Sequence, residues 1–383
     1  MDLPLALQLN RFQHRVLFVT VAAAALSILG GVFNRAQFFE SYLFAWLFWC
    51  GLSMGALVIV MMQFLTGGMW GVAIRRLSEA AFMALPVIAV LFLPVLFGMQ
   101  DLFPWSRADA IHTHAWVHKH AYLNTPFFVA RTMFYFAIVI TMAVLLRRWS
   151  RQQDEGDVLA PRRLRILSGG GLILYVLCMN FASTDWVMSL EPEWYSTIFV
   201  TVFMAGQFLA ALALMTALLA AFSEHTSLRW SIPAKVFHDL GNMLLAFVIF
   251  WIYVSFSQFL VIWSGNLPKE ISWYLHRSAG GWQWVALVLM LSQFFIPFAL
   301  LLSRAAKRHK SRLAAISALI VLANIVNNFW LVAPAFHPKR FSVHWMDFAE
   351  LLALGGIWSG AFIFFLKRRP LLPLSQAEGV HGG

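Results

Sequence analysis

Ionisable side chains lie inside several long apolar segments of this 383-residue sequence, where charge is expensive and therefore indicates chemistry. Asp185 is the clearest case, because it lies within the apolar segment 168–190 with Glu191 just beyond it. A carboxylate in a low-dielectric environment can hold and release a proton near neutral pH. The alternative is an ion pair with a base on a neighbouring helix, for which Arg131 is the candidate.

Further carboxylates lie near the ends of other apolar segments. Glu350 lies one turn into the last segment, with Asp347 three residues earlier on the same helical face. Glu79 opens the third segment, and His238 and Asp239 open the seventh, so these three side chains are candidates for a proton entry cluster. Ordinary helix starts also favour acidic residues, because negative charge suits the amino-terminal dipole. The predicted proton pathway comprises Asp185, Glu350, Asp239, His238 and Glu79.

Four histidines fall within nine residues of the segment 99–124, at His112, His114, His118 and His120. Four histidines so close together could ligate a metal, and their spacings of two and four suit a strand or helix face, but no acidic or cysteine partner accompanies them. Contact with a partner subunit or a quinone head group is favoured, because neutral imidazole can accept a proton from a quinol hydroxyl. We predict that His118, His120 and Arg131 border a quinone pocket, and we predict no metal site.

The sequence lacks the residues of a redox centre. None of its twelve histidines lies in the middle of an apolar segment, whereas a membrane cytochrome b needs facing histidine pairs. Cys50 and Cys178 are too few for an iron–sulfur cluster, which normally needs about four thiolates. We therefore expect haem and iron–sulfur clusters only in partner subunits, and any cofactor here to be a bound quinone, either menaquinone or ubiquinone.

Composition places these residues in a membrane protein. Hydrophobic residues make up 61% of the chain and charged residues 12%, against about 25% charged in ordinary globular proteins. Ten apolar segments are long enough to cross about 30 Å of hydrocarbon, and they cover approximately 15–33, 42–65, 80–98, 125–146, 168–190, 195–222, 237–263, 282–302, 313–335 and 346–366. The fold class predicted is an all-α polytopic membrane protein with about ten transmembrane helices.

Basic residues indicate the orientation of these segments. Lysine and arginine are concentrated in the two terminal tails and in the even-numbered connections. The positive-inside rule then predicts that both termini are cytoplasmic. The same bias accounts for most of the formal net charge of +11, so nucleic acid is not expected as a partner.

An internal repeat relates the second and sixth segments at an offset of 155 residues. The matched pairs are Ser41 and Ser196, Phe44 and Phe199, Phe48 and Phe203, Gly51 and Gly206, Ala56 and Ala211, and Leu57 and Leu212. Both blocks start on the same side, which predicts a parallel repeat of two four-helix bundles. The predicted division is 1–41 for the tail and flanking helix 1, 42–194 for the first bundle, 195–336 for the second, and 337–383 for flanking helix 10 and a cytoplasmic tail.

Four stretches of the chain resemble a known family. They are Thr66 to Gly71, Phe181 to Pro192, His238 to Gly241, and Phe256 to Pro268. These stretches are similar to the ActF-type subunits of bacterial alternative complex III, a quinol:electron-acceptor oxidoreductase, within the polysulfide-reductase-like (NrfD-type) membrane family. The similarity extends over about residues 10–366.

The resemblance implies a ten-helix subunit of a respiratory complex in the bacterial inner membrane, contributing to quinol binding or proton translocation. It implies as partners a second NrfD-like membrane subunit, an iron–sulfur subunit of the molybdoenzyme type and c-type haem subunits, and a terminal oxidase is a further expected partner. The productive quinol site is expected in the sister subunit. Residue roles carry over only to Asp185, His238 and Asp239.

Two other functions fit the same residues. A proton-coupled secondary transporter would use Asp185 as a coupling site between the repeats. Such transporters often have helices broken at matching places in both halves, but Pro86, Pro94 and Pro297 do not correspond. A purely structural anchor for peripheral redox subunits is the other alternative, and it predicts that neutralising the carboxylates changes assembly more than chemistry.

Overall fold

The computed structural model describes residues 3–107, 119–225 and 232–368. In these ranges it contains helices and no strands, and ten helices are long and apolar enough to cross a membrane. The chain is therefore an all-α polytopic membrane protein, as predicted. The main helices are α1 (Leu3–Phe33), α2 (Arg35–Thr66), α3 (Met69–Phe82), α4 (Leu85–Val90), α5 (Leu93–Phe97), α6 (Met99–Leu102), α8 (Thr125–Asp154), α9 (Ala160–Trp186), α10 (Phe199–His225), α11 (Ala234–Gly265), α12 (Pro268–Ser278), α13 (Trp282–Leu289), α14 (Ile296–Leu302), α15 (Arg304–Arg308), α16 (Lys310–Phe336) and α17 (Trp345–Leu366).

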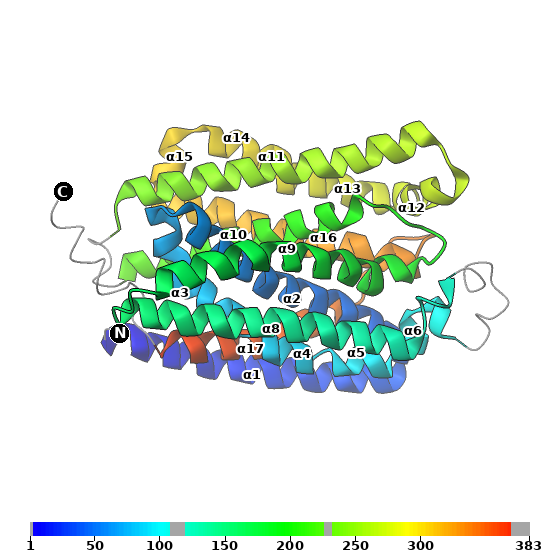
Figure 1. Ribbon diagram of the computed structural model, residues 1–383. Coiled ribbons are helices and arrows are strands. Elements are labelled where there is room, and N and C mark those ends of the chain that lie inside the picture. Colours follow the sequence, from blue (N-terminus) through cyan, green and yellow to red (C-terminus); the bar gives the residue numbers. More distant parts are fainter. Residues whose placement is uncertain (1–2, 108–118, 226–231, 369–383) are drawn as a thin grey trace.

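The long helices lie side by side and alternate in direction (Figure 1). One end of the bundle holds the starts of α2, α8, α10, α13 and α17, and the charge pattern predicts that this end is outer. The other end holds the starts of α3, α9, α11 and α16, and it is the predicted inner end.

Helix α2 is the centre of the fold. It packs against α1, α3, α9, α10, α16 and α17, and 89% of its most apolar stretch is buried. Gly51 and Gly55 are spaced as in a small-xxx-small motif, which lets two membrane helices approach closely. A Cβ atom at Gly55 would lie 2.5 Å from the backbone oxygen of Gln207 in α10. The contact between α2 and α10 therefore depends on the missing side chain.

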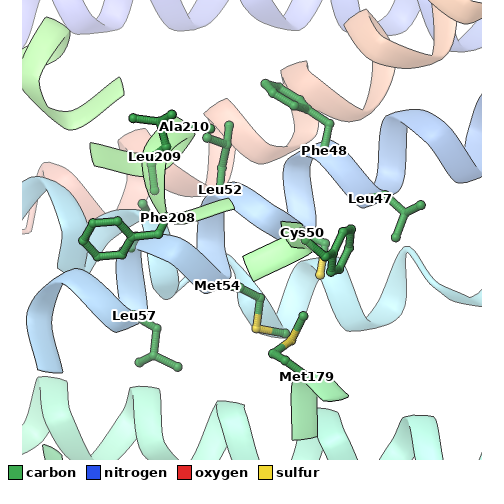
Figure 2. Packing of buried hydrophobic residues seen from close by; sticks show 14 of the residues in the cluster. Leu47, Phe48, Cys50, Leu52, Met54, Leu57, Met179, Phe208, Leu209 and Ala210 are labelled. Carbon is green, nitrogen blue, oxygen red and sulfur yellow. The ribbon is translucent and has the colours of Figure 1, made fainter. Parts of the chain in front are cut away.

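Interlocking apolar side chains fill the space around α2. Figure 2 shows Met54 and Leu57 of α2 with Met179 of α9 and Phe208 of α10. Cys50 belongs to the same cluster and is a buried free thiol, as is Cys178. Both cysteines therefore serve as apolar filler, which agrees with their positions in apolar segments.

The third membrane span starts earlier than predicted. It begins at Met69, because Gly67 and Gly68 have positive φ angles of 71° and 96° and turn the chain tightly after α2. Arg75 and Arg76, which the sequence placed in a connection, are buried within α3. Their charge lowers the mean hydropathy of the first turns of α3, so these turns were not predicted as part of the apolar segment.

Prolines shape two of the spans. The third span is divided into α3, α4 and α5, with Pro86 and Pro94 at the starts of the later pieces, because proline has no N–H to donate to the preceding turn. The eighth span contains a π-helical turn, Met290–Phe295, between α13 and α14. Helix α12, at the predicted outer end, was not predicted from the sequence.

Candidate functional site

Asp185 lies in the last turn of α9 and is fully buried. Arg131 of α8 binds both of its carboxylate oxygens, with Nη2 donating to Oδ1 over 2.8 Å and Nε donating to Oδ2 over 2.9 Å. The Tyr135 hydroxyl donates a third hydrogen bond to Oδ2 over 2.9 Å. This bidentate, charge-assisted geometry stabilises a carboxylate that would otherwise be an isolated buried charge. The ion pair considered from the sequence is therefore present in the structure.

The guanidinium group of Arg131 is enclosed on several sides. Its Nη1 donates to the backbone oxygen of Tyr122 over 2.9 Å, and its Cζ lies 3.8 Å from the centroid of the Tyr122 ring and 4.2 Å from that of Phe127. Burial and the nearby Asp185 charge raise the pKa of the Tyr122 hydroxyl. His118 lies outside the described residues, so the quinone border of His118, His120 and Arg131 stays a prediction.

A second group of carboxylates lies at the start of α17, also towards the predicted outer end. Glu350 is buried and accepts a hydrogen bond from the Ser27 hydroxyl of α1. Asp347 accepts from the Ser41 hydroxyl of α2 over 2.6 Å at Oδ1 and from the His344 amide over 2.8 Å at Oδ2. The last contact is half of a capping box that starts α17. The two carboxylates therefore contact two different helices, α1 and α2.

An apolar cavity of about 490 Å³ adjoins Asp347, which is a size typical of small-molecule sites. Its walls come from α2, α13, α16 and α17, and include Phe44, Phe329 and Phe348. Among the described lining residues, Asp347 alone carries a charge. This cavity could not be predicted from the sequence, because its walls are ordinary apolar residues that become neighbours only in the folded bundle.

A much smaller pocket of about 10 Å³ shares Phe44, Phe329 and Asp347 with the apolar cavity. It is lined by Glu40 and His337, whose Oε2 and Nε2 atoms are 3.0 Å apart. Glu40 lies at the start of α2, whereas His337 follows α16. The apolar cavity is thus bordered at one place by two carboxylates and an imidazole, which the sequence did not bring together.

Glu79 belongs to a network of charged side chains at the predicted inner end. Arg76 Nη1 donates to Glu79 over 2.8 Å, and the Ser150 hydroxyl of α8 donates to the other Glu79 oxygen. Asp154 at the end of α8 binds Arg76 and also Arg75, whose Nη2 donates to it over 2.9 Å. The network joins α3 to α8 and explains how α3 accommodates two buried arginines.

His238 and Asp239 form a separate group at the start of α11. His238 Nδ1 lies 3.8 Å from Asp239 Oδ1 and 3.3 Å from Asn242 Nδ2. Lys307 of α15 donates to Asn242 Oδ1 over 2.7 Å. Helices α3 and α11 are in contact, so Glu79 and His238 lie on neighbouring helices. The three residues of the predicted proton entry cluster therefore lie in two separate groups, one around Glu79 and one around His238 and Asp239. Their role in proton entry stays a prediction.

An ion-pair cluster that was not predicted from the sequence connects the two predicted bundles. Arg277, in the last turn of α12, is 2% exposed, and its Nη1 donates to Glu191 Oε1 over 2.8 Å. His276 Nδ1 lies 2.9 Å from the other Glu191 oxygen. Burial lowers the pKa of the Arg277 guanidinium, and the Glu191 charge opposes this effect. One signal in the sequence was available: Pro268 starts a short amphipathic helix, and His276 and Arg277 lie in its last turn. Such a turn could have indicated an acidic partner nearby.

Arg277 also holds the end of α16. It donates to the backbone oxygen of Leu331 over 2.9 Å, and its Cζ lies 3.8 Å from the centroid of the Trp273 ring. Arg277→Lys keeps the charge but loses the planar fork and the stacking. We expect it to lower the free energy of unfolding by about 1–3 kcal/mol, because carbonyl groups are left without donors. The check is the thermal unfolding midpoint in detergent, with the exposed Arg340→Lys as control, and equal midpoints for the two variants would contradict it.

The segments that carry the family resemblance lie mainly at helix ends. Gly67 and Gly68 turn the chain between α2 and α3, and Asn266 caps α11 in the left-handed conformation with φ of 47°. Pro268 then starts α12. These residues therefore have identifiable structural roles whatever the function. No protein-family model matches the chain, and a sequence search of curated proteins finds no match.

Proposed function

We propose that this chain is an integral membrane subunit of a quinol-oxidising respiratory complex of the alternative complex III type. It would contribute to quinol binding, proton translocation or both, while partner subunits hold the haem groups and iron–sulfur clusters. The expected partners are a second NrfD-like membrane subunit, an iron–sulfur subunit of the molybdoenzyme type, c-type haem subunits and a terminal oxidase. The complex would lie in the bacterial inner membrane.

The observation that carries this proposal is the set of buried acidic groups within the membrane-like bundle. Glu79 lies near the predicted inner end and is 4% exposed. Asp185 and Glu350 lie near the predicted outer end and are 0% and 2% exposed. Ionisable side chains within membrane-spanning helices are rare and usually mark ion pathways or ligand sites. Acid–base groups near both ends, with an apolar cavity beside Asp347, support a role in proton and quinol chemistry.

The structural-anchor alternative is supported by one specific contact. The bidentate pair of Arg131 and Asp185 connects α8 to α9, and its hydrogen bonds use both oxygens of the carboxylate. Such a pair can hold two helices in register without moving a proton. The secondary-transporter alternative has no comparable support, because the helix interruptions at Pro86, Pro94 and the π-helical turn lie at different places in the two halves.

The proposal is tested by gentle detergent purification of this chain from its native membrane. We expect co-purification of an iron–sulfur subunit and c-type haem subunits, a c-haem band in the reduced-minus-oxidised spectrum, and quinol-dependent reduction of an electron acceptor. The control is a mock purification from cells whose copy of the chain carries no affinity tag. A colourless protein that stays alone after mild extraction would overturn the proposal and favour the transporter.

A further inference from the structure

The apolar cavity beside Asp347 opens toward the region that lipid would occupy. Trp284 and Val288 of α13 are 65% and 53% exposed, and Phe348 of α17 is 61% exposed. Large apolar side chains exposed along membrane-spanning helices face hydrocarbon, not water. A long apolar molecule could therefore enter between α13 and α17 directly from the bilayer.

The inner part of the cavity is aromatic and ends at hydrogen-bond acceptors. Phe44 and Phe329 meet edge to face with ring centroids 5.4 Å apart, and both line the cavity, so its wall is aromatic. Asp347 lines the same cavity, and each of its oxygens has one donor in the structure. A carboxylate oxygen can accept a second hydrogen bond, so Asp347 can also bind a ligand hydroxyl.

The charges around the cavity select among apolar molecules that carry a polar head. The described lining contains the Asp347 carboxylate and no lysine or arginine, and Glu40 lies in the adjoining smaller pocket. At this end of the cavity a phosphate head group would be repelled by Asp347 and Glu40, whereas the basic Lys339 and Arg340, which precede the wall residue Phe341, are exposed. A neutral hydroxyl on an aromatic ring would instead donate a charge-assisted hydrogen bond to Asp347.

We propose that this cavity binds the head ring of an isoprenoid quinol, with a ring hydroxyl donating to Asp347 and the tail passing between α13 and α17. The inference rests on the proposed function for the identity of the ligand. The site differs from the predicted border of His118, His120 and Arg131, because its walls come mainly from α2, α13, α16 and α17, whereas Arg131 lies on α8. Glu40 and His337 lie in the adjoining pocket as the next acid–base pair.

The test is photoaffinity labelling of the purified native complex with an azidoquinone, followed by mass spectrometric mapping of the labelled peptides. We expect label on residues 281–288, 325–329 and 341–351, and competition by excess unmodified quinol. Label confined to other segments would overturn the proposal. A parallel sample with a photoreactive phospholipid distinguishes the two sources, and labelling of these walls by the phospholipid alone would also overturn it.

Two variants and a control sharpen the result. Val285→Phe, in the cavity wall, and Asp347→Asn should each reduce azidoquinone labelling at least about five-fold, through lost space and a weaker acceptor respectively. Leu287→Phe is the control, because Leu287 is exposed on the same helix and does not line the cavity. Equal labelling in all three variants would contradict the assignment.

Quinol-dependent acceptor reduction is measured on the same unlabelled preparation. If the complex is active but the cavity is not labelled, the assignment of this binding site is wrong and the proposed function still holds. If the cavity is labelled but the preparation contains no redox partners and shows no activity, the binding site is supported and the proposed function is overturned.

Discussion

Replacement of Arg131 by methionine should lower the free energy of unfolding by about 3–5 kcal/mol, the usual cost of breaking a buried ion pair by removing one partner. The variant leaves Asp185 fully buried with Tyr135 as a remaining hydrogen-bond donor. We expect a lower thermal midpoint in detergent and less assembled complex in the membrane. The control is Arg148→Met, on the same helix but exposed, which should change the midpoint little.

The double variant Arg131→Met with Asp185→Asn separates a structural role from proton chemistry. Removal of both charges should recover most of the lost stability, because no uncompensated carboxylate remains. If Asp185 also handles protons, the recovered complex will still show reduced quinol oxidation or a reduced proton-to-electron ratio. Normal turnover and proton yield in a stable double variant would instead assign the pair to anchoring. A stable Arg131→Met single variant would contradict the prediction of stability loss.

Gly55→Leu should be the most damaging apolar substitution on α2. Even its Cβ would lie 2.5 Å from the Gln207 backbone oxygen and 2.7 Å from the Ala211 Cβ atom, so α10 would have to move away. We expect a loss at or above the upper end of the usual 1–3 kcal/mol for overpacking, about 3 kcal/mol. The measurement is the yield of monodisperse protein and its unfolding midpoint.

Gly170→Leu on α9 is the matched control for Gly55→Leu. Gly170 is exposed, and a Cβ atom there would meet nothing within 4 Å. We expect the control to keep the parent midpoint. Similar behaviour of the two variants would show that close contact between α2 and α10 does not limit stability.

Much of the fold could be predicted from local properties of the sequence. Apolar segments of sufficient length gave ten spans, and ten helices of that kind are present in the described ranges. The start of the third span was misplaced because Arg75 and Arg76 resemble connection residues when Asp154 is not known to be their partner. Their burial depends on α8, which hydropathy of the third segment does not reveal.

The candidate site was harder to predict because its parts come from distant segments. Asp185 and Arg131 were recognisable, since each lies near the same end of consecutive membrane helices. Glu40 and His337 instead come from distant parts of the chain. Glu40 is an ordinary residue near the start of α2, and His337 directly follows the apolar helix α16. The apolar cavity depends on side-chain shapes at four helices, information that residue types and spacing do not contain.

The central position of α2 has a consequence for synthesis of the chain. This helix leaves the ribosome early, yet its partners α10, α16 and α17 begin only at Phe199, Lys310 and Trp345. At about 5–20 residues per second, α2 waits roughly ten seconds to one minute for these partners. During that interval the surface later covered by them faces lipid or the insertion machinery. Newly made chains are therefore most open to wrong helix pairing through Gly51 and Gly55, before the second half of the protein exists.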